Sequence, residues 1–297
     1  MSAVLRIGSR GSQLALWQAN HVADLLRKQG HTVEVQIIKT TGDRLQEAAF
    51  RAAHPEAVDG KGIFIKEIEE ALAAGAIDLA VHSLKDLPTE LAGEFTLGAI
   101  PSRVDARDAL LTVGGVGLGD LPQGARVGTT SPRRQSQLLA LRNDLRFIEM
   151  RGNVDTRIRK LMEGQAEAIV LASAGLERLG LTAHISHKFE VTEMCPAPGQ
   201  GALGIECRVE DAVTRAILAH LEDAATRYAV TAERAGLAAL GGGCAVPIGI
   251  YCERASGGYV LYGARQTARG LKRAEVVVGE DVAAAEAGRS IAAALAD

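Results

Sequence analysis

The motif at residues 128–135, Gly-Thr-Thr-Ser-Pro-Arg-Arg-Gln, combines side chains suited to binding an anion. Ser131 stands where a helix N-cap is expected, and Pro132 follows at the first helical position, where its missing N–H costs nothing. A helix N-terminus offers free N–H groups and a positive dipole end to a carboxylate or phosphate. Arg133 and Arg134 add planar forks for bidentate pairing. The alternative is an ordinary helix start with two solvated arginines.

Further arginines follow other expected strands. Arg151 comes directly after the strand expected at 146–149, and Arg157 lies in the helix after it. Arg10 and Arg178 also stand close to strand ends. A single arginine is usually a surface residue, but several on successive strand-to-helix loops predict a ligand with more than one negative charge. Nucleic acid is the rival polyanion. It requires a basic stripe, which the net charge of −3 disfavours.

A third loop, residues 82–86 (His-Ser-Leu-Lys-Asp), brings a hydroxyl, a cation and a carboxylate to the end of a buried strand. Cations around Asp86 favour its anionic form. That carboxylate could accept protons or stabilise a cationic intermediate. The alternative is that Asp86 only begins a turn before Pro88 and pairs with Lys85.

Cys244 lies in a glycine-rich loop, after the run at 241–243. Glycines expose the backbone and let a bulky group approach, so we expect a nucleophile or an attachment point. The alternative is a small buried residue, the usual state of a free cysteine. No histidine lies near it in the sequence to indicate a Cys–His dyad.

The composition limits the class of protein. A chain of 297 residues can form two or three domains. Aromatic residues are only 3%, which argues against the stacking platforms that bind single-stranded nucleic acid. We see no signal peptide and no apolar run that could span a bilayer. The four cysteines lack paired-ligand spacing, so we expect no zinc site, no disulfide framework and a cytoplasmic location.

Strand and helix patterns alternate along most of the chain. The residues from 41 to 62 have no clear period, and such a long connection is usually functional or disordered. The alternation predicts parallel sheets with helices on both faces, in two α/β lobes, followed from about residue 224 by a small α+β part. The expected strands are 4–8, 33–38, 77–81, 126–128, 146–149 and 168–171, with later ones around Ile248, Tyr259 and Val276. The expected helices are 13–28, 63–74, 132–142, 154–162, 174–179, 224–240 and 282–296.

Nine segments, in order from residue 5 to about 250, resemble the porphobilinogen deaminase (hydroxymethylbilane synthase) family. They are RIGSRGSQLALWQA, DGKGIFIKEIE, AVHSLKDLP, VGTTSPRRQ, RGNVDTR, VLASAGLERLG, PAPGQGALGIECR, TAERA and GGGCAVPIG. A single segment would be weak evidence, whereas nine in register are specific. Gly241 departs from the pattern of this family, in which an acidic residue often precedes the Gly-Gly-Cys.

The resemblance implies a transferase of tetrapyrrole (haem) biosynthesis. Four porphobilinogen molecules are joined head to tail, each with loss of ammonia, and hydrolysis releases hydroxymethylbilane, which uroporphyrinogen-III synthase takes up. It also implies a dipyrromethane cofactor that primes the chain. Cys244 matches the residue that holds this cofactor through a thioether. The runner-up is a non-enzymatic, two-lobed carboxylate-binding protein.

The resemblance also implies roles for single residues. Asp86 matches the catalytic aspartate, which binds pyrrole N–H groups and stabilises the positive charge that develops as ammonia leaves. Lys61 and Phe64 match the end of a mobile loop over the cleft, and Phe64 also lines the substrate position. The residues that match cofactor-binding positions are Lys85, Asp86, Thr129, Ser131, Arg133 and Arg134. Those that match substrate and chain positions are Arg10, Ser83, Arg151, Arg157 and Arg178.

The fold implied by the resemblance has two lobes like those of periplasmic binding proteins, joined by a hinge, and a small α+β C-terminal domain. Domain 1 is then residues 1–101 with 200–219, domain 2 is 106–195, and domain 3 is 224–297 and contains Cys244. A monomer is expected.

Overall fold

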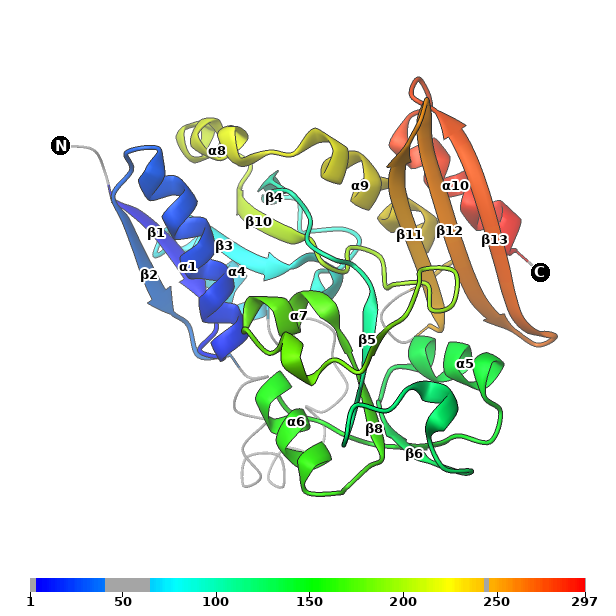
Figure 1. Ribbon diagram of the computed structural model, residues 1–297. Helices are drawn as coiled ribbons and strands as arrows, with labels where there is room; N and C mark the ends of the chain where they lie inside the picture. Colours follow the sequence, from blue (N-terminus) through cyan, green and yellow to red (C-terminus); the bar gives the residue numbers. More distant parts are fainter. Residues whose placement is uncertain (1–3, 41–64, 243–245, 297) are drawn as a thin grey trace. The chain divides into compact units, whose positions relative to one another are not determined.

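A computed structural model describes residues 4–40, 65–242 and 246–296 (Figure 1). Contacts between Cα atoms divide the chain into two compact units. The first unit comprises residues 1–102 and 203–223, and the second comprises 103–202 and 224–297. The three-domain boundaries and the hinge implied by the resemblance stay predictions. Within the described ranges, no helix is long and apolar enough to cross a membrane.

The first unit is built on a five-stranded mixed sheet with the strand order β2-β1-β3-β10-β4. β1 is parallel to β2 and β3, as expected, but β10 is antiparallel to β3 and β4. The expectation of a purely parallel sheet was therefore wrong, because β10 enters this sheet from a segment more than 100 residues further along the chain than β3. The strands are β1 (Leu5–Ser9), β2 (Val33–Ile37), β3 (Leu79–Ser83), β4 (Phe95–Ala99) and β10 (Leu203–Arg208).

Helix α1 (Gln13–Lys28) has the bounds that the sequence predicted. The Ser12 side chain caps its N-terminus by accepting a hydrogen bond from the Ala15 N–H at 3.4 Å. Gly30 follows its C-terminus with φ +89°, a left-handed conformation that favours glycine. Residues of its apolar face pack on one face of the sheet, against β1, β3 and β10.

Two other helices complete the layers of the first unit. α8 (Ala212–Leu218) shares the α1 face, where Leu218 joins the same apolar cluster. α4 (Lys66–Ala73) covers the opposite face and packs Ile68 and Leu72 against the sheet. The sheet is thus covered on both sides, as expected for an α/β layer.

The second unit contains another five-stranded sheet, with the order β7-β6-β8-β5-β9. β6 is parallel to β7 and β8, whereas β5 is antiparallel to β8 and β9. The strands are β5 (Asp108–Thr112), β6 (Arg126–Gly128), β7 (Arg146–Ile148), β8 (Ala168–Ala172) and β9 (His187–Lys188). Helix α5 (Pro132–Leu141) covers one face, and α6 (Val154–Met162) and α7 (Ser173–Arg178) cover the other.

The last part of the second unit is a three-stranded antiparallel sheet with two helices on one face. Its strands confirm the three that were expected around Ile248, Tyr259 and Val276. They are β11 (Ile248–Ala255), β12 (Gly258–Thr267) and β13 (Gly270–Gly279), covered by α9 (Ala224–Ala239) and α10 (Ala284–Leu295). The α/β class with a small α+β C-terminal part is confirmed.

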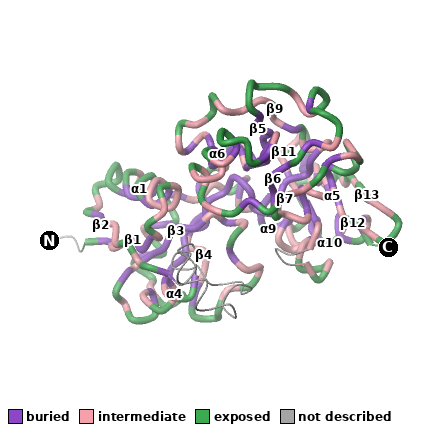
Figure 2. The backbone as a smooth tube through the Cα atoms, turned by 90° about the horizontal axis from the view of Figure 1, so that it is seen from below, coloured by how far each residue is buried: buried purple, intermediate pink, exposed green. Residues whose placement is uncertain are grey.

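Burial is concentrated along the central strands, which are purple in Figure 2, as β3 and β5 show. The strands β4, β5 and β10 were not predicted. Each is short, and its sequence has no period that separates a strand from a helix. β10 begins at Leu203, near the end of a segment, residues 195–204, that is rich in proline and glycine.

Candidate functional site

Four expected site residues lie at one edge of the first unit's sheet. β1 and β3 are adjacent and parallel, so their carboxyl ends meet at the same edge. Arg10 follows β1, and Ser83 is the last residue of β3. Lys85 and Asp86 lie in the 3-10 turn Leu84–Asp86 directly after it, where Asp86 is exposed.

Gln18 is a polar residue of this edge that the sequence analysis missed. It is 3% exposed on the buried face of α1, and its Nε2 donates a hydrogen bond to Ser83 Oγ at 2.8 Å. A polar residue among the apolar positions of the α1 face was the available signal, because buried amides need partners. Gln18 fixes the orientation of the Ser83 hydroxyl.

The other described candidates lie at one edge of the second unit's main sheet. β6, β7 and β8 run parallel, so the segments after them converge. The first of these segments begins α5, the second begins α6 and the third forms α7. Their candidate residues are Thr129, Ser131, Arg133 and Arg134 after β6, Arg151 and Arg157 after β7, and Arg178 in α7. The combination of this group with Asp86 into one site stays a prediction.

The start of α5 has the capping geometry that the sequence predicted. Ser131 is the N-cap, and its Oγ accepts a hydrogen bond from the Arg134 N–H at 3.4 Å. Pro132 is the first helical residue. Thr129 Oγ1 accepts from the Ser131 N–H at 3.2 Å, which orders the loop before the helix. The N–H groups of the first turn are therefore directed toward the strand edge.

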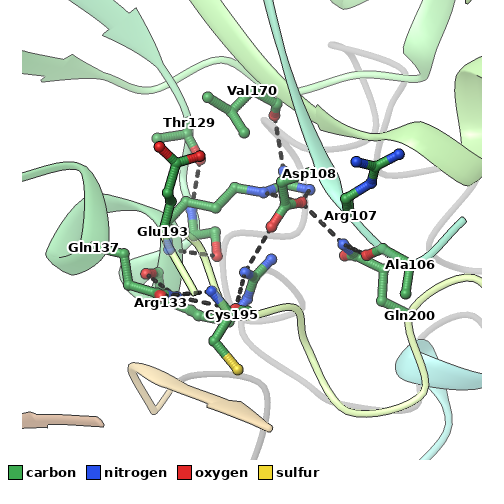
Figure 3. A network of polar contacts seen from close by, with 12 residues as sticks. Ala106, Arg107, Asp108, Thr129, Arg133, Gln137, Val170, Glu193, Cys195 and Gln200 are labelled. Atoms are coloured by element: carbon green, nitrogen blue, oxygen red, sulfur yellow. Dashed lines mark hydrogen bonds and ion pairs between the residues drawn. The ribbon is translucent and has the colours of Figure 1, made fainter. Parts of the chain in front are cut away.

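Arg133 and Arg134 are buried and share a carboxylate that the sequence analysis missed. Figure 3 shows this carboxylate, on Asp108, among its polar contacts. Asp108, the first residue of β5, accepts from Arg133 NH1 at 2.7 Å and from Arg134 NH2 at 2.7 Å. Gln200 Nε2 donates to the same carboxylate at 3.0 Å. Backbone carbonyls hold the forks further, with Val170 O 2.8 Å from Arg134 NH1. The alternative of two solvated arginines is wrong.

The Asp108 cluster, defined as Asp108 with Arg133 and Arg134, has a net charge of +1. Burial alone would raise the pKa of Asp108, but the two guanidinium charges outweigh it and hold that pKa well below its usual value. Burial also lowers the pKa of Arg134, with Asp108 opposing the shift. An uncompensated positive charge beside a helix N-terminus suits a ligand carboxylate. These residues therefore fit a cofactor with carboxylate side chains.

The segment after residue 194 ties α5 to the C-terminal sheet. Cys195 O accepts from Arg133 NH1 at 2.8 Å and from Gln137 Nε2 at 3.0 Å. β11 lies against the same segment, since a Cβ added at Gly249 would come within 2.4 Å of Cys195 O. The Ile250 N–H also donates to Pro196 O at 3.1 Å. The Arg133 guanidinium group in α5 and the start of β11 are thereby both held against the same segment.

The remaining arginines differ in burial. Arg178 is 8% exposed, and its NH2 donates to Gly201 O at 2.8 Å. Burial lowers the pKa of Arg178 to about 10, with Glu177 opposing. Arg151 is exposed and pairs with Glu149, whereas Arg157 is half-buried. Among the residues described, no group of three or more His, Cys, Asp or Glu could hold a metal ion.

Three expected site residues, Cys244, Lys61 and Phe64, lie outside the described residues. The structure does explain Gly241. Its φ is +64°, and its N–H donates to Ala238 O at 2.9 Å, so it ends α9 in the left-handed conformation. A side chain at this position would be strained, which gives a local reason for glycine here.

Changing Asp108 to Asn should destabilise the protein by about 3–5 kcal/mol, because two buried guanidinium groups lose their anionic partner. The measurement is the free energy of unfolding in denaturant. Asp120→Asn, at an exposed position of the same unit, should change little. Since the pKa of Asp108 in the folded protein lies below the ordinary aspartate value of 3.8, its contribution to stability is complete above that pH and is lost as pH falls. Equal stability of D108N and wild type at pH 7 would contradict this role.

Two family models match most of the chain. The model described as porphobilinogen deaminase, dipyromethane cofactor binding domain, covers residues 5–216. The model described as porphobilinogen deaminase, C-terminal domain, covers residues 227–297. The first range contains β1 to β10, and with them every described candidate residue.

Curated relatives agree with these models. Porphobilinogen deaminase of Roseiflexus sp. (strain RS-1) is 53% identical over 251 residues, which are 84% of this chain and 81% of the relative. That of Maridesulfovibrio salexigens is 51% identical over 84% of this chain and 80% of the relative. That of Nocardia farcinica is 46% identical over 97% of this chain and 84% of the relative.

The solved structures that match part of this chain include periplasmic binding proteins. The methionine binding protein MetQ covers 73% of this chain and 89% of its own at 13% identity, with a TM-score of 0.47. A periplasmic substrate-binding protein of an ABC transporter from Coxiella burnetii covers 75% of this chain and 94% of its own at 15% identity, with a TM-score of 0.44. The α/β assignment itself rests on the observed sheets and helices.

Proposed function

Because this chain belongs to the porphobilinogen deaminase family, a family of transferases, we propose that it joins four porphobilinogen molecules head to tail and releases hydroxymethylbilane. The observation that carries the proposal is the coincidence of two features in residues 5–216. This range matches the cofactor-binding family model, and it contains the buried, net positive Asp108 cluster at a helix N-terminus. The alternative of a non-enzymatic carboxylate-binding protein is not favoured.

The dipyrromethane cofactor, when bound, supplies the pyrrole to which the first porphobilinogen is joined. We propose that Lys85, Thr129, Ser131, Arg133 and Arg134 bind its carboxylates. Arg133 and Arg134 are held rigid by Asp108 and by backbone carbonyls, so little side-chain entropy is lost when they bind an anion. Ser131 and Thr129 order the loop from which the first N–H groups of α5 point.

Cys244 is the proposed attachment point, through a thioether. β11 begins at Ile248, four residues after Cys244. The start of β11 packs on Cys195 and Pro196, whose carbonyl groups also connect it to α5. The packing of these described neighbours supports a covalent anchor that shares one unit with the Asp108 cluster.

Asp86 is the proposed catalytic residue. It is exposed at the end of a turn whose flanking residues, Leu84 and Leu87, are 0% and 3% exposed. Two buried leucines thus hold the turn while its carboxylate faces outward. A fixed carboxylate can bind pyrrole N–H groups and stabilise the positive charge that develops as ammonia leaves, without reorganisation at the moment of reaction.

The substrate carries an acetate and a propionate, which need cations to orient them. We assign this role to Arg10, Ser83, Arg151, Arg157 and Arg178, with Phe64 lining the site. Cations held in fixed positions bind the substrate carboxylates and thereby orient the reacting atoms. Lys61, at the end of the loop that the resemblance implies, would help to close the site and exclude water.

The same family relationship supports the wider cellular assignment. We propose a cytoplasmic monomer that binds neither nucleic acid nor membrane and passes its product to uroporphyrinogen-III synthase. Size-exclusion chromatography with light scattering would give the oligomeric state.

Incubation of the purified protein with porphobilinogen tests the reaction. We expect four porphobilinogen consumed and four ammonia released for each hydroxymethylbilane formed. A carboxylate-binding protein would instead bind porphobilinogen stoichiometrically without releasing ammonia. Binding without ammonia release by protein of confirmed cofactor content would overturn the proposed function.

A further inference from the structure

A buried acid–base pair lies behind the turn that contains Asp86. His82 Nε2 is 2.9 Å from Glu206 Oε2, and the two side chains are 8% and 0% exposed. His82 belongs to β3 and stands four residues before Asp86, whereas Glu206 belongs to β10. The pair thus joins two strands that are 124 residues apart in the sequence. None of the roles proposed above uses it.

Burial of this pair costs desolvation free energy, which suggests that the pair is kept for a reason other than stability. Glu206 Oε1 is also buried and has no hydrogen-bond partner among the described residues. A buried carboxylate with an unsatisfied oxygen costs free energy that an apolar residue of similar size would not. The other oxygen, Oε2, is within hydrogen-bond distance of His82 Nε2, so the two side chains constrain each other's position.

Another carboxylate, that of Glu69 in α4, interacts electrostatically with this pair. Burial raises the pKa of Glu69 in α4, and the charge of Glu206 raises it further, while His82 opposes the shift. Glu94, before β4, adds a smaller repulsion. Glu69 therefore lies close enough to the His82–Glu206 pair to interact with both of its members.

The same strand, β10, also supports the turn directly. Gly204 is paired with His82 in the β3–β10 register. A Cβ added at Gly204 would lie 2.9 Å from Leu84 Cδ1 and 3.3 Å from Leu87 Cδ1. Both leucines flank Lys85 and Asp86. A side chain at position 204 would therefore press against the two residues that hold this turn. We call Gly204, Glu206 and His82 the β10 seat.

We propose that the β10 seat positions Asp86 for the reaction, with Glu206 and His82 as positioning residues that do not touch the substrate. Glu206 fixes the end of β3 through the imidazole of His82, and Gly204 fixes the height of the turn through Leu84 and Leu87. The inference rests on the proposed function, because it takes Asp86 as the catalytic residue. An error of about 1 Å in a catalytic group can reduce the rate on the order of 100-fold.

Glu206→Gln tests the seat while keeping the side-chain volume. Cofactor content by intact mass and the KM for porphobilinogen should remain close to wild type, whereas kcat should fall about 10- to 100-fold. Glu94→Gln is the matched control, because Glu94 is an exposed carboxylate of the same neighbourhood that is not bonded to His82. It should keep the wild-type kcat. An unchanged kcat in folded E206Q would overturn the proposal.

Gly204→Ala provides a test that alters no charge. The added methyl should displace Leu84 and Leu87 and lower kcat with the cofactor retained. Each change is then combined with Asp86→Asn. Because the seat acts through Asp86, neither E206Q nor G204A should reduce the residual kcat of D86N further, which is strong non-additivity. Additive losses would show a general structural role and contradict the inference.

The single variant Asp86→Asn distinguishes a failure of the proposed function from a failure of the β10 seat alone. If D86N turns over normally, the role of Asp86 in the proposed function fails, whatever the seat variants do. If D86N loses turnover while E206Q and G204A keep it, the proposed function stands and only the seat is wrong. Thermal melting of each variant identifies any that fails to fold, and the other seat variant then decides.

Discussion

Replacing Cys244 with serine is expected to abolish the covalent mass excess that wild-type protein carries. The excess should equal one dipyrromethane, because a thiolate forms the thioether whereas a serine hydroxyl is a weak nucleophile without an adjacent base. Intact-mass spectrometry of the purified proteins measures the difference directly. Activity should be lost with the cofactor, since no primer remains on the chain.

The other cysteines provide the controls for this experiment. Cys195, Cys207 and Cys252 are free and buried, and burial raises the pKa of Cys195 to about 12. Such thiols stay protonated and unreactive. Cys252→Ala should therefore retain the mass excess. An excess that persists in C244S, or that is absent from fully assembled wild type, would contradict the anchor assignment.

Replacing Asp86 with alanine should leave a folded protein that retains its cofactor but turns over about 100- to 1,000-fold more slowly. This is the loss typical of removing one preorganised group that stabilises transition-state charge. The fold should survive because Asp86 is exposed, while the buried Leu84 and Leu87 hold the turn. The measurements are porphobilinogen consumption, intact mass and thermal melting.

Glu90→Ala is a suitable control for Asp86→Ala. Glu90 is an exposed acid shortly after the same turn, so its removal changes the local charge equally without removing the proposed catalytic group. We expect turnover close to wild type in E90A. A D86A variant with a wild-type rate would refute the catalytic role, and a D86A variant without cofactor would move Asp86 from catalysis to cofactor assembly.

The sequence alone determined the elements whose signals are local. The bounds of α1 and α6 were predicted to the residue, because the 3.6-residue period of each helix lies within its own sequence. Ser131 and Pro132 predicted the start of α5 for the same reason. The ordered motifs predicted the family, since nine matching segments carry far more information than any one of them.

Only the tertiary structure decided which side chains share a site. Asp108 meets Arg133 across 25 residues, Gln18 meets Ser83 across 65, and His82 meets Glu206 across 124. No local period encodes such pairings. They arise when strands from distant segments become neighbours in a mixed sheet and buried polar groups must find partners there. The sequence therefore predicted an anion site at the start of α5, and the fold showed that an internal carboxylate holds its two arginines in place.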